Sequence, residues 1–392
     1  MIVVPGGYWA SPNKHPGNVM VFENGYWQNY SVYYMMSHLD GMLTYDYSDA
    51  AIDPEDPSHF FIASCGAGLF EFRNNEFYMR HMHDNSAIDS MFAPENFYTW
   101  VDGLTYDNQG NLWMTNMLEN HSPYGVKVLK KDGSWVKIAN KACSNLNRTH
   151  DLLIWNQDPA IKIITNARLG AGIGVWNDHG TIEQQSDDRA VFIKEFVDQK
   201  GKQVTPTYIY SICQTKTGAL WVGTEAGIFI IDDPRELLNG SKLCRRVIIN
   251  RTDDSGLADY LLGTEQVNAI AEDGVGRIWL GTASSGLYLV SQDGKEIIHH
   301  FTIDDSPIPS DNILSLAIRP STGEVFIGTG AGLVSFQSDA SEPKPDFSTA
   351  YAYPNPVPPD YAGYITITGL MDESVIYIVD NGGNLVCQTH AN

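Results

Sequence analysis

The chain has 392 residues and carries 47 acidic against 25 basic side chains, a formal net charge of −22. This charge disfavours binding to nucleic acid and direct docking onto an anionic membrane surface. Apolar residues never run for 18 positions, which predicts no transmembrane segment, and the five cysteines have no CxxC spacing that would indicate a zinc site.

The N-terminal residues predict part of one structural unit. IVVPGGYW, GNVMVFENG and YWQNY indicate three strands, without the first strand of a four-stranded unit. Met1 is followed at once by IVVPGG, which lacks the basic region and apolar core of a signal peptide. Either the protein stays inside the cell or the chain is a fragment or mature portion of a longer protein, and the C-terminal region described below favours a fragment.

A pattern of buried strand, tight glycine turn and second strand then recurs along the chain. Its clearest copies are LWVGTEAGI at 220–228, IWLGTASSGL at 278–287 and VFIGTGAGL at 325–333, and weaker copies lie at 59–72, 111–116 and 161–166. The copies align on one large apolar anchor each, with spacings of 52, 50, 58, 58 and 47 residues: Phe61, Trp113, Ile163, Trp221, Trp279 and Phe326. Such a period is typical of a repeat architecture.

Each repeat has the size of a propeller blade. An apolar run and a Gly- or Asn-containing turn precede each anchor, which predicts a meander of about four short strands. Six such units and the partial N-terminal one predict an all-β fold, a seven-bladed β-propeller over residues 1–336. In this context we expect the aromatic anchors to pack between blades rather than to form a carbohydrate platform.

The C-terminal region differs from the repeats. Residues 337–350 are polar and contain proline, which predicts a linker, and residues 351–392 predict the start of an immunoglobulin-like β-sandwich. Its three predicted strands are ITITGL, SVIYIVD and LVCQT, the last two joined by a hairpin at NGGN. One apolar face would lie bare, so the module is expected to dock on the propeller, pair with a second copy or belong to a longer domain.

Two motifs carry a resemblance to known families. The [IL]W[VL]GT strand followed by GL or GI resembles the two-component-regulator propeller repeat, which also fills periplasmic sensors of hybrid histidine kinases in Bacteroidetes. YPNPV with ITITGL and the DNGGNLV hairpin resembles the C-terminal module of the type IX (Por) secretion system. Together with the runs at 258–282 and 299–318, this order of motifs is similar to that of PorZ-type surface proteins.

The resemblance implies a function for the chain. PorZ-type proteins have two seven-bladed propellers and an immunoglobulin-like domain, and they act at the outer-membrane surface in an attachment complex. Their implied partners are a sortase-like cysteine peptidase, outer-membrane proteins and lipopolysaccharide. Two alternatives are a ligand-sensing periplasmic propeller of a hybrid two-component kinase and a lyase or hydrolase propeller that works in its central funnel.

The residues predict no chemistry of their own. The chain has no GxSxG, and GxG at 66–68 and 330–332 lies in predicted hairpins with no helix to follow. His81 and His83 would face one side of a strand, where they and Asp84 could bind a metal ion, but a polar loop is the favoured interpretation. His299 and His300 would alternate faces. The Asp-rich stretches 53–57, 252–256 and 303–307 could hold calcium through their oxygens, but none has EF-hand spacing, and turns are the favoured interpretation.

We therefore expect a binding and assembly protein, not an enzyme, with no catalytic residue, no metal site and no cofactor. No ligand-binding residue is assigned. The long inter-blade segments 73–100, 116–125, 177–207 and 232–265 are where a repeat fold would place its binding loops.

Overall fold

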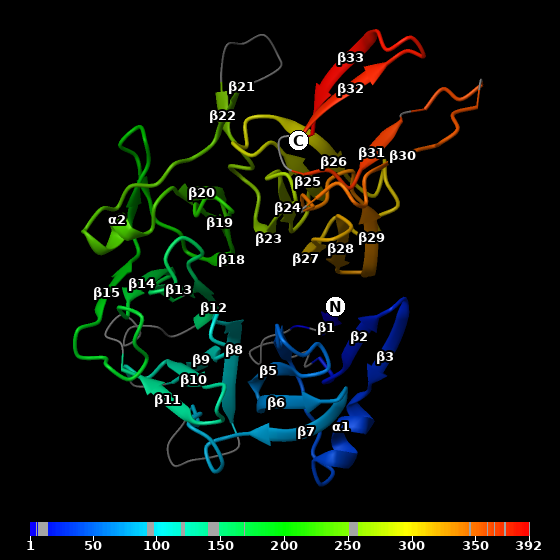
Figure 1. Cartoon of the computed structure of the whole chain (residues 1–392). Coiled ribbons are helices and arrows are strands. Elements are labelled where there is room, and N and C mark those ends of the chain that lie inside the picture. Colours follow the sequence, from blue (N-terminus) through cyan, green and yellow to red (C-terminus); the bar gives the residue numbers. More distant parts are fainter. Residues whose placement is uncertain are drawn as a thin grey trace. The chain divides into compact units, whose positions relative to one another are not determined.

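A computed structural model describes residues 1–4, 6, 15–91, 98–118, 122–139, 149–167, 169–250, 258–344, 346–358, 360–363, 365–371 and 374–391. These residues form two compact units, Met1–Val267 and Asn268–Asn392. Strands dominate both units, which confirms the all-β class, and the helices described are the short α1 (Val32–His38) and α2 (Arg235–Leu238) (Figure 1). None of the helices in the described ranges is long and apolar enough to cross a membrane.

The first unit consists of antiparallel meanders. Its N-terminal sheet contains β1 (Ile2–Val3), β2 (Val19–Glu23) and β3 (Tyr26–Tyr30). The next two meanders contain β4 (Tyr47–Ile52), β5 (Phe60–Gly66), β6 (Gly68–Arg73), β7 (Glu76–His81), β8 (Thr99–Tyr106), β9 (Leu112–Met117), β10 (Val126–Leu129) and β11 (Trp135–Ile138). A short pairing of β5 with β8 joins these two meanders into one eight-stranded sheet.

Two further meanders and two hairpins complete this unit. The meanders contain β12 (Thr149–Ile154), β13 (Ile161–Asn166), β14 (Gly172–Asn177) and β15 (Arg189–Ile193), then β18 (Ile209–Gln214), β19 (Leu220–Thr224) and β20 (Gly227–Ile231). The hairpins pair β16 (Phe196–Val197) with β17 (Gln203–Val204) and β21 (Ile248–Asn250) with β22 (Ala258–Tyr260). The predicted inter-blade segments 177–207 and 232–265 thus contain strands of their own.

The second unit contains two meanders and a C-terminal extension. The meanders consist of β23 (Val267–Glu272), β24 (Ile278–Thr282), β25 (Leu287–Val290) and β26 (Ile297–Phe301), then β27 (Ile313–Arg319), β28 (Glu324–Thr329) and β29 (Gly332–Gln337). The division between the units falls at the first residue of β23.

The repeated Gly-Thr turn has a structural explanation. In the β19–β20 turn the Thr224 hydroxyl donates to the Gly227 carbonyl at 2.9 Å and accepts from the Ala226 amide. Thr282 and Thr329 donate in the same way to the carbonyls of Gly286 and Gly332. Gly227 has a φ of +86°, and a Cβ there would lie 2.5 Å from the Leu262 carbonyl oxygen. This turn therefore requires glycine.

The six anchors lie in the second strand of their sheets, and all are at most 7% exposed. Phe61 packs in one cluster with Val101 and Met114 of the next meander. Trp279 packs in the same way against Ile313 and Val325 of the sheet that follows it. The predicted packing between successive meanders is confirmed for Phe61, Trp113, Ile163 and Trp279. The buried aromatic anchors cannot serve as a sugar platform.

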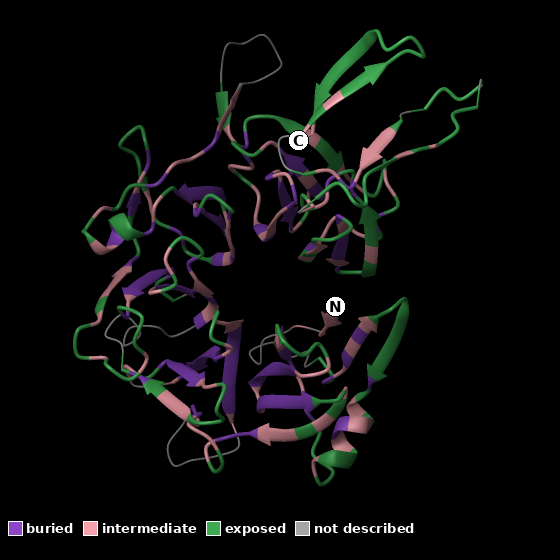
Figure 2. Cartoon of the chain, viewed as in Figure 1, coloured by how far each residue is buried: buried purple, intermediate pink, exposed green. Residues whose placement is uncertain are grey.

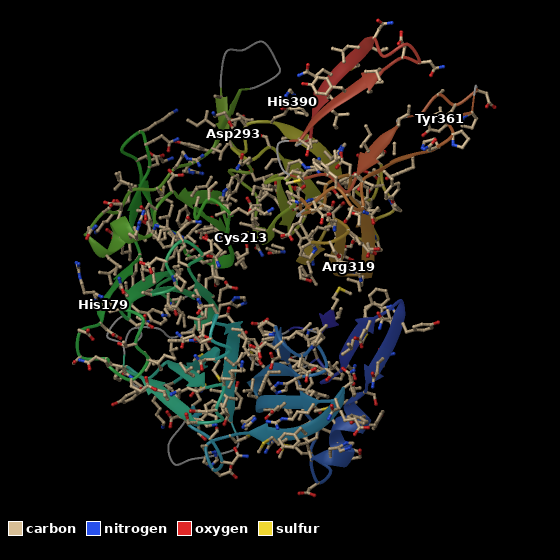
Figure 3. All side chains as sticks on the ribbon, viewed as in Figure 1. His179, Cys213, Asp293, Arg319, Tyr361 and His390 are labelled. Carbon is tan, nitrogen blue, oxygen red and sulfur yellow. The ribbon has the colours of Figure 1, made fainter. Side chains whose placement is uncertain are left out.

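The C-terminal extension forms two separate hairpins, each with two strands. They pair β30 (Tyr351–Tyr353) with β31 (Thr366–Thr368) and β32 (Val375–Val379) with β33 (Leu385–His390). The prediction of three strands was wrong by one, because Tyr351–Tyr353 pairs with a strand that follows a proline-containing connection. Tyr361 lies on this connection and His390 ends β33 (Figure 3). The predicted NGGN turn is confirmed, and β33 is exposed throughout (Figure 2).

Candidate binding site

The two histidines of the predicted polar loop do not share a site. His81 is the last residue of β7, and its Nε2 lies 2.7 Å from Glu71 Oε2. His83 lies beyond the strand, where its Nδ1 is 3.2 Å from the Ser90 hydroxyl. The expectation that both rings face one side was wrong because β7 ends between them. Among the described residues no group of three or more His, Cys, Asp or Glu side chains could hold a metal ion.

The other candidates from the sequence have structural partners. The His300 ring stacks on Tyr288 with centroids 3.9 Å apart, whereas the His299 ring packs against Phe301, so the two rings do not form one ligand pair. Asp56 accepts from Ser58 and Asp305 accepts from Thr302, which confirms their roles in turns. The stretch 252–256 lies outside the described residues.

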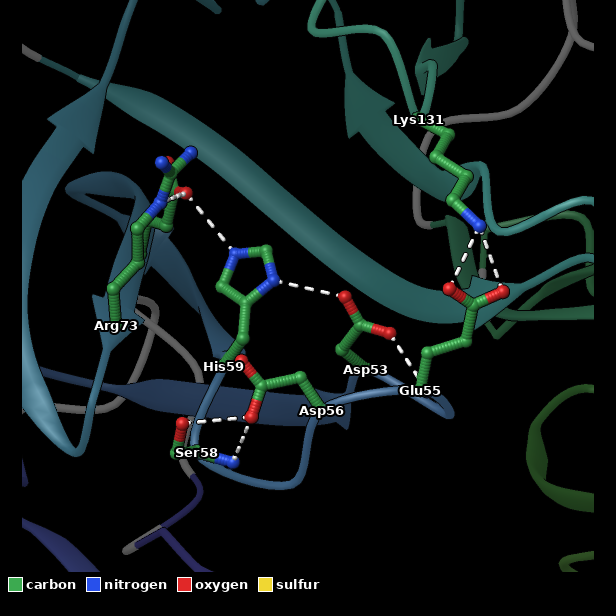
Figure 4. Close-up of polar contacts among 8 residues, drawn as sticks. Asp53, Glu55, Asp56, Ser58, His59, Arg73 and Lys131 are labelled. Atoms are coloured by element: carbon green, nitrogen blue, oxygen red, sulfur yellow. Dashed lines mark hydrogen bonds and ion pairs between the residues drawn. The ribbon is translucent and has the colours of Figure 1, made fainter.

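Glu71 is the centre of a buried ionic network in the second meander. Its carboxylate is 1% exposed and accepts from three cations or potential cations: His59 at 3.1 Å, His81 at 2.7 Å and Arg73 at 2.6 Å. The other nitrogen of His59 lies 2.9 Å from Asp53 (Figure 4). The partners satisfy each oxygen of Glu71, so this network holds strands together and offers no open ligand position.

A row of aspartates occupies equivalent positions on three first strands, β4, β8 and β12. The residues are Asp49, Asp102 and Asp151. Asp49 Oδ2 accepts from the Leu104 amide of the next first strand at 2.7 Å. Ser211 stands at the corresponding position of β18 and donates to the Val267 carbonyl. Asp49 and Ser211 therefore each link one first strand to the next by a hydrogen bond.

Two aspartates of the row, Asp49 and Asp102, resist ionisation. Burial, followed by repulsion from Asp102, raises the pKa of Asp49 to about 7. Burial also raises the pKa of Asp102 to about 6, against the opposing effect of His150. Because both pKa values are raised in the folded state, the protein binds protons more tightly folded than unfolded above about pH 4. The free energy of unfolding is therefore not reduced by these two groups at low pH, where both are protonated. It falls as the pH rises towards 7 and they ionise.

We expect Asp49→Asn to remove part of this pH dependence. The amide keeps an acceptor for Leu104 and carries no charge at any pH. The melting temperature of the variant should fall less than that of the wild type between pH 5 and pH 8, and should exceed it at pH 8. Asp84→Asn, a change at an exposed acid, is the control. Identical pH profiles for Asp49→Asn and the wild type would contradict the assignment.

A cavity of roughly 290 Å³ lies beside β5 and β7 in the first unit. Residues 42–46, residues 65–67, Arg80 and Tyr98 line it. Two polar groups of the wall already have partners: the Thr44 hydroxyl bonds Tyr47, and Asp46 accepts from the His15 amide at 2.9 Å. Mainly apolar walls with few polar groups are typical of small-molecule sites.

Arg80 is the cation of this cavity. It is half-buried on β7, and its Nη1 contacts the sulfur of Met42 at 2.8 Å. Burial lowers its pKa, and charge interactions with Asp84 and Tyr47 act in the opposite direction. No salt bridge joins Arg80 to a carboxylate of the described residues. The cavity is therefore the candidate binding site.

Sequence reasoning did not find the aspartate row or the Arg80 cavity. The row had a visible signal, because an aspartate occupies the same place in the runs SDAAI, VDGLTY and HDLLI. The signal for Arg80 is weaker: it is a basic residue within the strand EFYMRH of a strongly acidic chain. The cavity itself had none, since its walls come from segments up to about 55 residues apart.

Known proteins share features of this architecture. The two component regulator propeller family matches residues 203–226 and 261–284. None of the curated proteins compared matches the chain. The structure of PorZ from Porphyromonas gingivalis, described as an essential bacterial surface component of the type-IX secretion system, aligns with 100% of the chain at 28% identity and a TM-score of 0.80. The chain spans 52% of the length of PorZ.

Two other structures align at a TM-score of 0.35, too low to place strands or sites in this chain. One is the extracellular domain of the putative hybrid two component system BT4673 from B. thetaiotaomicron, at 12% identity over 97% of this chain and 53% of that chain. The other is a putative gluconolactonase, at 11% identity over 74% of this chain and 88% of that chain.

The chain is thus a β-propeller protein that contains two-component-regulator propeller repeats. Within that class its fold is of the PorZ type, as the alignment over the entire chain shows. The resemblance seen in the GT-turn repeats is confirmed.

Proposed function

We propose that this chain belongs to a non-enzymatic scaffold of a type IX secretion machinery and acts at the outer-membrane surface or in the periplasm. The observation that carries the proposal is the likeness to PorZ, at a TM-score of 0.80 and 28% identity over the whole chain. By the same resemblance, its partners are a sortase-like peptidase and outer-membrane proteins, with lipopolysaccharide as a further ligand. Binding to protein partners suits the rim loops of a rigid repeat fold.

The proposed architecture is a seven-bladed propeller over 1–336, a linker at 337–350 and the start of an immunoglobulin-like module at 351–392. The three- and four-stranded meanders and the buried anchors support the propeller. The start of the linker is held by Arg277, which donates to Ser338 and Asp339. The two exposed hairpins that follow support a separate module.

A sensor role is the second candidate function. It is supported by the match to two component regulator propeller repeats, which covers parts of two meanders. The two roles predict different consequences for a cell that lacks the protein, because a scaffold acts on secreted cargo and a sensor acts on transcription.

Deletion of the gene in its source bacterium tests the proposal. For a scaffold we expect type IX cargo to be lost from the cell surface, with recovery when the full-length gene is restored. The measurements are surface labelling of cargo and the transcript profile of the same cultures. Normal surface cargo with a changed set of transcripts would refute the scaffold role and support the sensor.

A further inference from the structure

We propose that the cavity beside β5 and β7 binds a small organic acid, with its apolar body in the cavity and its single carboxylate on the guanidinium of Arg80. This inference does not depend on the scaffold function. It rests on the contacts of Arg80, on the walls of the cavity and on the charge that the walls already carry.

The side-chain contact of Arg80 engages few of the N–H donors of its guanidinium. A guanidinium has five N–H donors, and a thioether sulfur is a weak acceptor. The side-chain contact of Arg80 within the described residues is to Met42 Sδ at 2.8 Å. Arg73 and Arg277 instead donate to buried carboxylates, those of Glu71 and Asp273, at 2.6 and 2.7 Å. Arg80 has no such salt bridge within the described residues, although the charge of Asp84 acts on it.

The cavity has room and a surface suited to an apolar group. Its volume of roughly 290 Å³ corresponds to about ten water molecules at about 30 Å³ each. Met42, Leu43, Ala67 and the Tyr98 ring contribute apolar surface to its walls. The absence of a side chain at Gly66 keeps one wall open, because a Cβ there would lie 3.2 Å from the Tyr98 ring. A ligand of about ten non-hydrogen atoms with one aromatic ring would bury its apolar surface here.

The charge of the walls favours a monoanion. Arg80 supplies one positive charge, and guanidinium and carboxylate form paired charge-assisted hydrogen bonds. Asp46 lines the same cavity, is 2% exposed and accepts from the His15 amide. A second negative charge on the ligand would be brought towards this carboxylate, which disfavours phosphate dianions and dicarboxylates. The favoured ligand class is therefore an aryl or alkyl monocarboxylate.

The test uses 3-phenylpropionate and 3-phenylpropionamide as probes, with the full chain and isothermal titration calorimetry. The two probes have nearly the same shape and differ in charge. We expect the wild type to bind the acid at least about tenfold more tightly than the amide. Arg80→Gln should weaken binding of the acid by about tenfold or more and abolish this preference. Arg189→Gln, a change of an arginine outside the cavity, is the matched control and should bind like the wild type.

A second variant separates the carboxylate from the apolar body. Leu43 is 47% exposed, so Leu43→Ala should fold normally and remove part of the cavity wall. It should weaken the acid and the amide by the same factor and keep the preference for the acid. The proposal is overturned if the wild type does not bind the acid, if acid and amide bind equally, or if Arg80→Gln binds the acid as tightly as the wild type.

Discussion

Replacing Trp279 by alanine is expected to lower the free energy of unfolding by about 3–5 kcal/mol, the usual cost of removing a large buried aromatic side chain. The Trp279 side chain is fully buried. It stacks on Phe301 with ring centroids 6.1 Å apart and packs against Ile313 and Ile327 of the next sheet. The cavity left by alanine would separate two sheets, which relax less easily than an exposed loop. Urea unfolding followed by circular dichroism measures the change.

Trp279→Phe is the matched control for this prediction. The indole Nε1 has no hydrogen-bond partner among the described residues, so phenylalanine loses volume but no hydrogen bond. We expect it to cost less than half as much as alanine. A near-neutral alanine variant would mean that the side chain is exposed, and would return the sugar platform to consideration.

Replacing Glu71 by glutamine is expected to cost about 3–5 kcal/mol near pH 5.5, the usual penalty for breaking a buried ion pair. The neutral amide would face His59, His81 and Arg73, and its NH₂ group would meet donors. Burial raises the pKa of Glu71, but hydrogen bonds from the same three side chains outweigh it and hold the pKa well below its usual 4.5. The hydrogen bond that His59 donates to Glu71, opposed by burial, raises the pKa of His59 above its usual 6.5.

These two directions set the pH window of the Glu71 network. The lowered pKa of Glu71 contributes stability above about pH 4.5 that is lost in acid. The raised pKa of His59 contributes stability below about pH 6.5 that is lost as the pH rises further. The decrease in the free energy of unfolding caused by Glu71→Gln should therefore be greatest between about pH 4.5 and pH 6.5, and smaller at pH 3.5 and pH 8.5. Glu76→Gln, at an exposed position of β7, should be nearly neutral throughout; an equal cost for both variants would contradict a special role for Glu71.

The features that the sequence determined by itself are local ones. Alternating apolar residues and the Gly-Thr turn act within a few residues, since Thr224 reaches Gly227 and a positive φ requires glycine. Each anchor could therefore be assigned to a second strand, and its apolar character predicted burial. The same local reasoning identified the NGGN hairpin, where Asp380 accepts from the Asn384 amide.

The tertiary structure decided which polar groups meet. The end of β7 separated His81 from His83 and placed His81 on Glu71. Asp49 meets Leu104, which is 55 positions away, and Arg80 meets Met42, which is 38 away. Such contacts depend on how one sheet packs on the next and leave no periodic signal in the chain. The repeat architecture could therefore be predicted from the sequence. The aspartate row and the Arg80 cavity depend on how the sheets pack together and could be found only in the tertiary structure.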